Sequence, residues 1–323
     1  RQRSWRSAAP DGALCAAQDD LCHEGRRPLT APSTRRAELV AQAQTSIALG
    51  SRSFALASRL FAPDTRERAW LLYSWCRKCD DIADGQDHGG ALSRVEDPAG
   101  RLSYLQQMTE RALAGDITGD PAFDALGLVA AETDLPPQWP RDLIQGFAMD
   151  AADFSPRNQS DLLLYCYHVA GVVGLMMAVI MGVRPDDAET LGRANDLGLA
   201  FQLANIARDI SEDAEAGRCY IPADWLAEFN IPPGDHMQPQ HRTAMAKIAQ
   251  RLAALAAGYE ASARIGARRL PFRSRWAVLA AAGIYGDIAR EVARRGTAAW
   301  DHRVVTSKMA KAGWVVRAFF AAL

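Results

Sequence analysis

Helix-forming patterns run almost without interruption from about Arg35 to the end of this 323-residue chain. Alanine and leucine are abundant, alternating β-branched residues are rare, and glycine or proline interrupts the sequence at intervals of about one helix length. Few segments could therefore pair as strands. We predict an all-α fold, a bundle of roughly ten helices around one core.

The chain divides into a polar N-terminal segment and one long domain. Residues 1–34 mix arginine, proline, aspartate and alanine without periodicity, which is typical of a disordered extension. Residues 35–323 contain no glycine- and serine-rich linker that would separate two domains. We therefore expect a single domain over residues 35–323.

Breaker residues predict several helix boundaries. Pro63 and Asp64 indicate the start of one helix, with Asp64 as its N-cap, and Gly85 indicates its end. Another helix is expected over residues 161–181. Residues 184–187 should then start a helix that ends near residue 199, and a further helix should cover residues 197–215. Three alanine-rich helices are expected to finish the chain.

The composition excludes nucleic acid as a partner and indicates a reducing compartment. The formal net charge is −1 and the pI is about 6.7, so the chain lacks the positive field with which proteins bind nucleic acids. Its six cysteines are scattered, which is typical of free thiols in the cytosol. Cys76 and Cys79 could be half a zinc site or a redox pair, but no second pair accompanies them. Helix packing is the simpler interpretation.

The longest apolar run, VAGVVGLMMAVIMGV, covers residues 169–183. It is shorter than the roughly 20 residues that a helix needs to cross a membrane, which favours a buried helix. Ala170, Gly171 and Gly174 keep this helix slim. Val173 and Met176 would offer an apolar lining, beside which a long hydrocarbon chain could fit. An ordinary core helix would show the same pattern.

Two acidic motifs have matching spacing. Asp80 and Asp84, and likewise Asp209 and Asp213, stand four residues apart, which places each pair on one face of a helix. Such like charges repel each other, so a positive partner is expected. Mg²⁺ fits, because it binds one or two carboxylates together with water and phosphate oxygens.

Each acidic pair continues a polar stripe along its helix. Tyr73 and Arg77 precede the first pair at helical spacing, and Gln202 and Asn205 precede the second, with Arg208 beside them. Two such stripes would suit opposite walls of a metal–diphosphate cavity, where arginines bind phosphate oxygens in bidentate fashion. Two solvated helix faces, with each arginine merely neutralising an aspartate, are the alternative interpretation.

Four segments resemble the signatures of one enzyme family. They are SRSFALASRLF (51–61), YSWCRKCDDIAD (73–84), YCYHVAGVVG (165–174) and NIARDISEDAEAGRCYIP (205–222). They resemble the head-to-head isoprenoid synthases, the family of squalene, dehydrosqualene and phytoene synthases, and the similarity extends over roughly residues 40–310. The resemblance implies an isoprenoid-synthase helical bundle with two prenyl diphosphates in a central cavity.

The resemblance also implies roles for individual residues. Metal binding, by Mg²⁺ or Mn²⁺, would fall to Asp80, Asp84, Asn205, Asp209 and Asp213. The catalytic set would be these four aspartates together with Tyr73, Arg77 and Arg208. Substrate contacts would come from Ser51, Ser53, Phe54, Tyr165, Val169, Val173, Gly174, Gln202, Asn205, Arg218, Tyr220, Tyr285 and Arg303. Asp150 aligns with a further acidic position of the family.

Within the family, residues 217–225, 270–292 and 300–311 are most similar to bacterial phytoene synthases, although Gly283 and Gly286 stand where bulkier residues are usual. This implies condensation of two geranylgeranyl diphosphates without NADPH. Squalene or dehydrosqualene synthesis from the C15 diphosphate is the nearest alternative. A terpene cyclase and a non-catalytic helical scaffold are more distant ones. The lipid substrate and product imply a cytoplasmic enzyme in peripheral contact with the inner membrane, with possible hand-over to a downstream desaturase.

Overall fold

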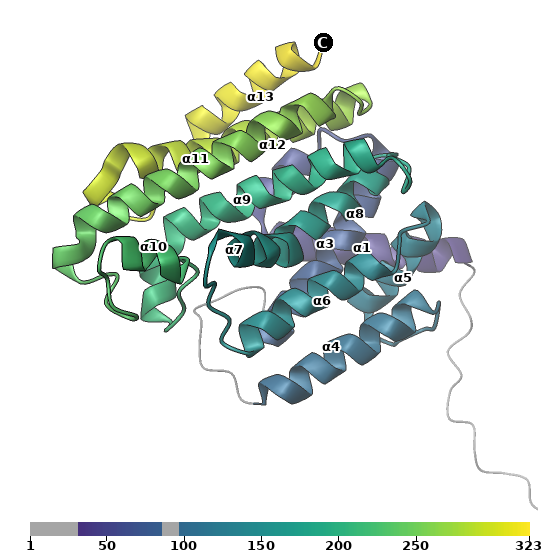
Figure 1. The fold of residues 1–323 in the computed structure, drawn as a ribbon. Helices are drawn as coiled ribbons and strands as arrows, with labels where there is room; N and C mark the ends of the chain where they lie inside the picture. The colour runs from purple at the N-terminus through teal and green to yellow at the C-terminus, as the bar shows by residue number, and fades with distance from the viewer. Residues whose placement is uncertain (1–31, 86–96) are drawn as a thin grey trace, which may run out of the picture.

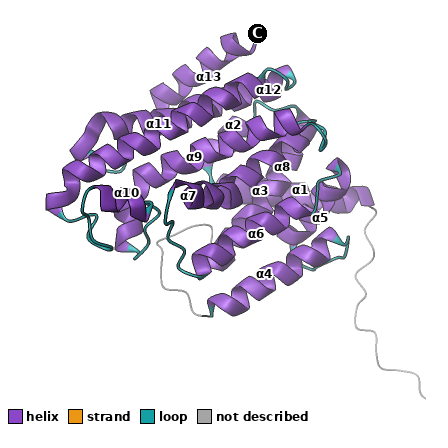
Figure 2. Cartoon of the chain, in the orientation of Figure 1, coloured by secondary structure: helices purple, strands orange, loops and turns teal. Residues whose placement is uncertain are grey.

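The computed structural model describes residues 32–85 and 97–323, without the side chains of residues 32, 33, 52 and 53. These parts of the chain are helical and contain no strand (Figure 2). The expected N-terminal extension falls mostly on residues 1–31, outside the described residues. The first helix starts at Pro32, three residues before the predicted domain boundary.

Thirteen α-helices and three short helical turns form the described part of the molecule (Figure 1). The α-helices are α1 (Pro32–Gly50), α2 (Arg52–Ser58), α3 (Pro63–Asp84), α4 (Pro98–Leu113), α5 (Pro121–Thr133), α6 (Gln138–Ala151), α7 (Gln159–Cys166), α8 (Val172–Ile180), α9 (Ala188–Glu215), α10 (Ala223–Glu228), α11 (Arg242–Ala267), α12 (Phe272–Arg295) and α13 (Lys308–Ala322). The turns are η1 (Tyr167–Gly171), η2 (Pro239–His241) and η3 (Gly296–Ala298). The all-α prediction is confirmed.

Two large clusters make up most of the hydrophobic core, beside two smaller ones. One joins α1, α3, α4, α5, α6 and α8, with Trp75 and Phe123 fully buried. The other joins α7, the C-terminal half of α9, α10, α11 and α12, with Trp225 of α10 fully buried. Helix α9 runs between the two in Figure 1 and contributes Leu191 to the first cluster and Leu203 to the second. The acidic motif of α3 is therefore carried by the first cluster, and that of α9 by the half of the helix that packs in the second.

Helix α3 begins and ends close to the predicted residues. Pro63 occupies its first position and Gly85 ends it in the left-handed conformation, with a φ of 66°. The N-cap is Ala62, and Asp64 lies in the first turn, so the prediction of Asp64 as N-cap was wrong. Proline is favoured at the first helical position because its φ is already helical, so the N-cap is the residue before Pro63 and not the one after it.

The apolar run forms the end of a nearly continuous helix from Gln159 to Ile180. A π-helical turn, η1, separates α7 from α8. Among the described residues this segment alone is long and apolar enough to cross a membrane, and half of its most apolar window is buried inside the protein. It packs against α6 and α9, as expected for a core helix.

Helix α9 is a single helix of 28 residues, where we expected two. Gly198 lies at the expected break, but the helix continues through it. A Cβ at this position would overlap the backbone of Ala170 and Gly171. Glycine is therefore used here for close approach of two helices, and its cost to the helix, about 1 kcal/mol relative to alanine, is offset by packing.

Candidate active site

Arg77 organises the acidic motif of α3. Its guanidinium contacts Asp80 at 2.9 Å through Nη1 and Asp81 at 2.6 Å through Nη2, one helical turn further along. The Nε of Arg77 also donates a hydrogen bond to Asp81 at 3.0 Å. Asp81 was not among the predicted site residues, although its i+4 spacing from Arg77 is the signal that could have identified it.

Asp209 on α9 lies between two arginines. Arg208 donates to it through Nε at 2.7 Å, and Arg303 approaches it through Nη2 at 2.9 Å. Arg303 lies in the segment that leads into α13, and it also pairs with Glu212 at 3.1 Å. The predicted residues Arg208, Asp209 and Arg303 are thus brought together. Glu212, four residues after Arg208, is a further member that the sequence analysis missed.

Arg218 links the two acidic motifs. It lies just after α9, and its Nη2 is 3.3 Å from Oδ1 of Asp84 at the end of α3. Gly217, with a φ of 75°, provides the turn that brings the chain back across the C-terminal end of α9. The C-terminal ends of α3 and α9, with their carboxylates, therefore face the same space.

Asp150 on α6 forms a third wall of this space. It accepts hydrogen bonds from the hydroxyls of Tyr165, at 3.0 Å, and Tyr220, at 2.8 Å. The two tyrosine rings stack on each other with centroids 4.7 Å apart, and Phe154 stacks on Tyr165 at 5.6 Å. This arrangement fixes the orientation of both predicted tyrosines.

The electrostatics show that the carboxylates form one cluster. Burial, together with the carboxylates of Asp209, Glu212 and Asp150, raises the pKa of Asp213 to about 7 against the opposing effect of Arg218. Burial also raises the pKa of Asp80, to about 6, against the effect of Arg77 and with help from Asp84, Asp81 and Asp150. The Asp80 side chain is 41% exposed, so solvent screens part of this effect. Asp150 affects both aspartates, which places α6 within electrostatic reach of both motifs.

The cluster has an excess of negative charge that a cation could neutralise. Its seven carboxylates outnumber its four guanidiniums by three when all are ionised; the acids are Asp80, Asp81, Asp84, Asp150, Asp209, Glu212 and Asp213, and the bases are Arg77, Arg208, Arg218 and Arg303. Within the described ranges, the buried Oε2 of Glu212 also has no hydrogen-bond partner. These donors fit a hard divalent cation.

The protein donors do not form a complete metal cage. In the described part of the chain, no three histidine, cysteine, aspartate or glutamate side chains lie close enough together to hold a metal ion. A cation at this site would need further ligands from water and from phosphate oxygens. This is how Mg²⁺ is usually held beside a phosphorylated substrate.

Tyr73 lies against the junction of α1 and α2. A Cβ on Gly50 would lie 2.5 Å from the Tyr73 hydroxyl, and the Phe54 ring lies 5.6 Å from the Tyr73 ring. Ser51 caps α2 by accepting a hydrogen bond from the backbone N–H of Phe54 at 3.3 Å. Ser51, Phe54 and Tyr73 are therefore close together, beside Arg77. The side chain of Ser53 is outside the described residues.

Tyr285 on α12 stacks on Phe201 of α9, with ring centroids 4.1 Å apart. Burial raises its pKa, and the positive charge of Arg208 lowers it, so the phenol lies within electrostatic reach of the second motif. Gln202 and Asn205 are half-buried on α9, one to two turns before Asp209. The predicted polar stripe of α9 is thus continuous from Gln202 to Asp213.

A comparison with known families agrees with this geometry. The family model of the squalene/phytoene synthases matches residues 47–310, which include both acidic motifs. The chain belongs to the squalene/phytoene synthase family.

Curated members of the family resemble the chain over most of its length. A 15-cis-phytoene synthase of Pantoea ananas is 46% identical over 271 residues, which are 83% of this chain and 87% of that protein. A phytoene synthase of Pseudescherichia vulneris is 45% identical over 289 residues, 87% of this chain and 93% of the relative. Among solved structures, a dehydrosqualene synthase in complex with a ligand superposes with a TM-score of 0.79 at 25% identity, covering 89% of this chain and 98% of the other.

The structure of this family member changes the interpretation of the apolar helix. A Cβ on Gly174 would overlap the carbonyl oxygen of Ala194, and one on Gly171 would overlap the side chain of Asn195. Both glycines therefore allow α9 to approach closely, and they do not leave room for a prenyl chain on that side. Val169 packs against Gly146 of α6, and Val173 against the first core cluster.

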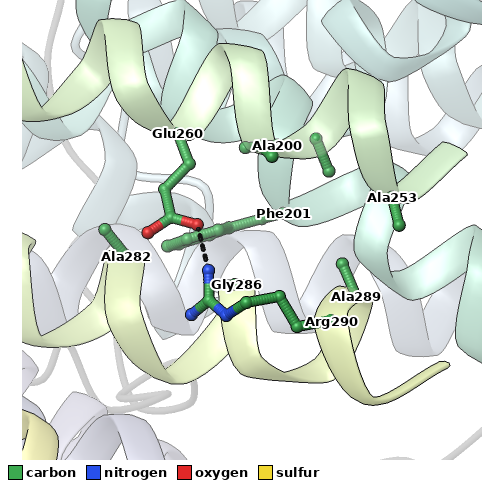
Figure 3. A pocket seen from close by; sticks show the side chains of 10 residues that line it. Ala200, Phe201, Ala253, Glu260, Ala282, Gly286, Ala289 and Arg290 are labelled. Carbon is green, nitrogen blue, oxygen red and sulfur yellow. Dashed lines mark hydrogen bonds and ion pairs between the residues drawn. The ribbon is translucent and has the colours of Figure 1, made fainter. Parts of the chain in front are cut away.

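Neither of two cavities formed by the described residues is lined by Val169, Val173 or Gly174. The larger, of about 450 Å³, borders the first acidic motif, since Arg77 and Asp81 lie on its wall together with Lys78. The smaller, of about 10 Å³, lies between α9, α11 and α12, where Glu260 pairs with Arg290 at 3.0 Å (Figure 3). A Cβ on Gly286 would overlap the Glu260 carboxylate, which explains why a bulkier residue is not found there.

Proposed function

We propose that this chain is a phytoene synthase, which condenses two molecules of geranylgeranyl diphosphate head to head and releases diphosphate. Support comes from bacterial relatives of that name, which are 45–46% identical over more than four fifths of the chain. The observation on which the proposal most depends is the pair of acidic motifs on α3 and α9, joined through Arg218 and Asp84. Two opposed motifs suit two diphosphate groups.

The residues of the cluster would bind and orient the diphosphates. Mg²⁺ or Mn²⁺, when bound, would supply positive charge that stabilises the departing diphosphate. The residues that would hold it are Asp80, Asp84, Asn205, Asp209 and Asp213. Arg208 and Arg303, which contact Asp209 in the structure, can exchange that contact for phosphate oxygens without leaving the site.

The proposed reaction has two stages. Loss of diphosphate from one substrate gives an allylic cation, and the C2–C3 double bond of the second attacks it and loses a proton, which gives a cyclopropylcarbinyl diphosphate. Ionisation of that compound, rearrangement and a second proton loss give phytoene. No reductant is consumed, so NADPH is not required. Diphosphate released in the first stage would accept each proton, or a tyrosine such as Tyr165 or Tyr220 would accept it while passing its own hydroxyl proton to Asp150.

We also propose where the enzyme acts in the cell. Substrate and product are lipids, which favours a cytoplasmic enzyme in reversible contact with the inner membrane. A desaturase that accepts the hydrocarbon would be the next enzyme in the sequence of reactions.

Product analysis tests the proposal directly. The purified protein is incubated in detergent with Mg²⁺ and either the C15 or the C20 diphosphate, with and without NADPH, and the extracted hydrocarbon is identified. We expect phytoene from the C20 substrate without NADPH. Efficient squalene formation that depends on NADPH, or dehydrosqualene from the C15 substrate, would contradict the proposed substrate, and no product at all would favour a non-catalytic role.

A further inference from the structure

The C-terminal helix α13 is held firmly on its inner face. The Trp314 ring occupies the space beside Gly283, where a Cβ would overlap it, and its indole N–H donates to Asp287. The indole N–H of Trp276 donates to the carbonyl of Val315 at 2.8 Å. Ala318 and Ala322 are buried against α11 and α12. One side of α13 is therefore fully engaged with the protein.

The outer face of α13 is apolar as well. Met309, Val316, Phe320 and Leu323 follow one another at helical spacing and are 87%, 57%, 68% and 78% exposed. A surface helix normally presents polar residues on the side that faces away from the core. In Figure 1, α13 lies at the outer edge of the molecule, beyond α12. We call these four residues the α13 stripe.

The charges beside the α13 stripe have a single sign. Helix α13 contains three basic residues, Lys308, Lys311 and Arg317, and no acidic residue. Lys308 and Arg317 are exposed and lie on opposite sides of the stripe by helical spacing. An apolar helix face with phenylalanine, flanked by lysine and arginine, is typical of helices that lie in the interface of an anionic bilayer.

We propose that the α13 stripe is a docking surface for an anionic lipid bilayer, with Met309, Val316, Phe320 and Leu323 inserted among the lipids. Lys308 and Arg317 contact the headgroups. Because the inner face of α13 is already packed, docking does not require the helix to detach. This inference rests on the proposed function only in that a lipid substrate gives the enzyme a reason to meet a membrane.

Vesicle flotation of the full chain tests the inference. Vesicles of phosphatidylcholine alone are compared with vesicles that also contain phosphatidylglycerol. We expect the protein to float with the anionic vesicles and to be released as the salt concentration rises. The variant Val316→Gln/Phe320→Gln should lose roughly tenfold in vesicle binding, whereas Leu164→Gln, at an exposed leucine of α7, should bind like the unmodified protein. Lys308→Gln/Arg317→Gln should lose the preference for anionic vesicles.

Two controls separate the possible failures. The melting temperature of each variant shows whether α13 is still folded, and hydrocarbon formation in detergent shows whether the enzyme works without a membrane. Protein that remains wholly in the soluble fraction, or equal flotation of the stripe variant, would overturn the inference while leaving the proposed function intact. A lipid-free dimer that the stripe variant abolishes would also overturn it, in favour of a second copy of this chain.

Discussion

Asp213 is the residue whose protonation should be most visible in the stability of the protein. Burial and neighbouring carboxylates raise its pKa to about 7 in the folded protein, far above its ordinary value. The folded state therefore binds a proton more tightly than the unfolded state between about pH 4 and pH 7. The stability gained from this proton is fully present below that range and is lost as the pH rises through 7.

We therefore predict that Asp213→Asn changes the pH dependence of unfolding in metal-free protein. With EDTA present, the melting temperatures of variant and unmodified protein should be similar at about pH 4, and the variant should become the more stable of the two as the pH rises to about 7 and above. A series of thermal melts over this range measures the difference. Parallel curves would show that Asp213 does not titrate in this way.

Asp80 and Asp209 are the first aspartates of the two acidic motifs. Replacing either by asparagine should lower enzyme activity to a similar extent, but the two replacements should change the stability of the protein differently. Burial and the neighbouring carboxylates raise the pKa of Asp80 although Arg77 pairs with it, whereas Asp209 accepts from Arg208 and also pairs with Arg303. We predict that Asp80→Asn and Asp209→Asn each lower turnover by about 10²-fold or more, because each removes a proposed metal ligand.

Thermal stability then distinguishes the two variants. Asp80→Asn should leave the metal-free melting temperature unchanged or raise it, since it relieves repulsion. Asp209→Asn should lower stability by about 1–3 kcal/mol, because Arg208 loses its carboxylate partner and Arg303 keeps only Glu212. Asp224→Asn, at an exposed position on α10, is the matched control and should alter neither quantity. Full turnover in both site variants would refute the metal assignment.

At the scale of the elements, sequence reasoning succeeds where one residue determines the local backbone. Pro63 and Gly85 mark the two ends of α3, because proline fixes φ and glycine alone adopts the left-handed cap without strain. Sequence reasoning fails where a contact with a residue far away in the sequence determines the course of the helix. Gly198 has the local character of a helix breaker, and only the approach of Ala170 explains why α9 continues through it.

In the candidate site, too, the features that depend on local helix geometry could be predicted from the sequence, and those that depend on distant contacts could not. The spacing of Asp80, Asp84, Asp209 and Asp213 predicts that each pair shares a helix face, because helix geometry is local. Spacing cannot predict that Arg218 crosses to Asp84, or that Gly174 faces Ala194 and not a ligand. Such contacts depend on how α9 lies relative to α3 and α8, which the separate sequence segments do not reveal.

Gly283 is predicted to control the attachment of α13. Gly283→Ala would place a methyl group inside the Trp314 ring, and overpacking of this kind costs about 1–3 kcal/mol. The melting temperature should fall by a few degrees. Gly258→Ala on α11, where a Cβ meets nothing within 4 Å, should raise it slightly, because alanine favours the helix.

A double-variant cycle shows whether Trp314 is the cause. In a Trp314→Ala background, Gly283→Ala should cost little, because the ring that it would strike is absent. If the glycine substitution is equally costly with and without Trp314, then the strain lies elsewhere, in the backbone of α12.

At the scale of the whole molecule, the site connects two parts of one core. Asp80 and Asp84 are carried by α3 in the first hydrophobic cluster, and Asp209 and Asp213 by the half of α9 that packs in the second. Arg218 joins them through one partly exposed contact of 3.3 Å to Asp84, and such contacts contribute about 1 kcal/mol or less. A ligand that both motifs hold would make a stronger link than the protein alone.

We therefore predict that Mg²⁺ and inorganic diphosphate stabilise the protein only in combination. A ligand at about 100 times its dissociation constant adds about 2.7 kcal/mol to the free energy of unfolding, which should raise the melting temperature by about 5 °C or more for a chain of this size. Mg²⁺ alone lacks the phosphate ligands that complete its coordination, and diphosphate alone meets seven carboxylates. Each should therefore shift the melting temperature little, and Asp84→Asn should reduce the combined shift. If diphosphate with EDTA gave the full shift, the arginines would be sufficient to hold it, and the carboxylates would need another explanation.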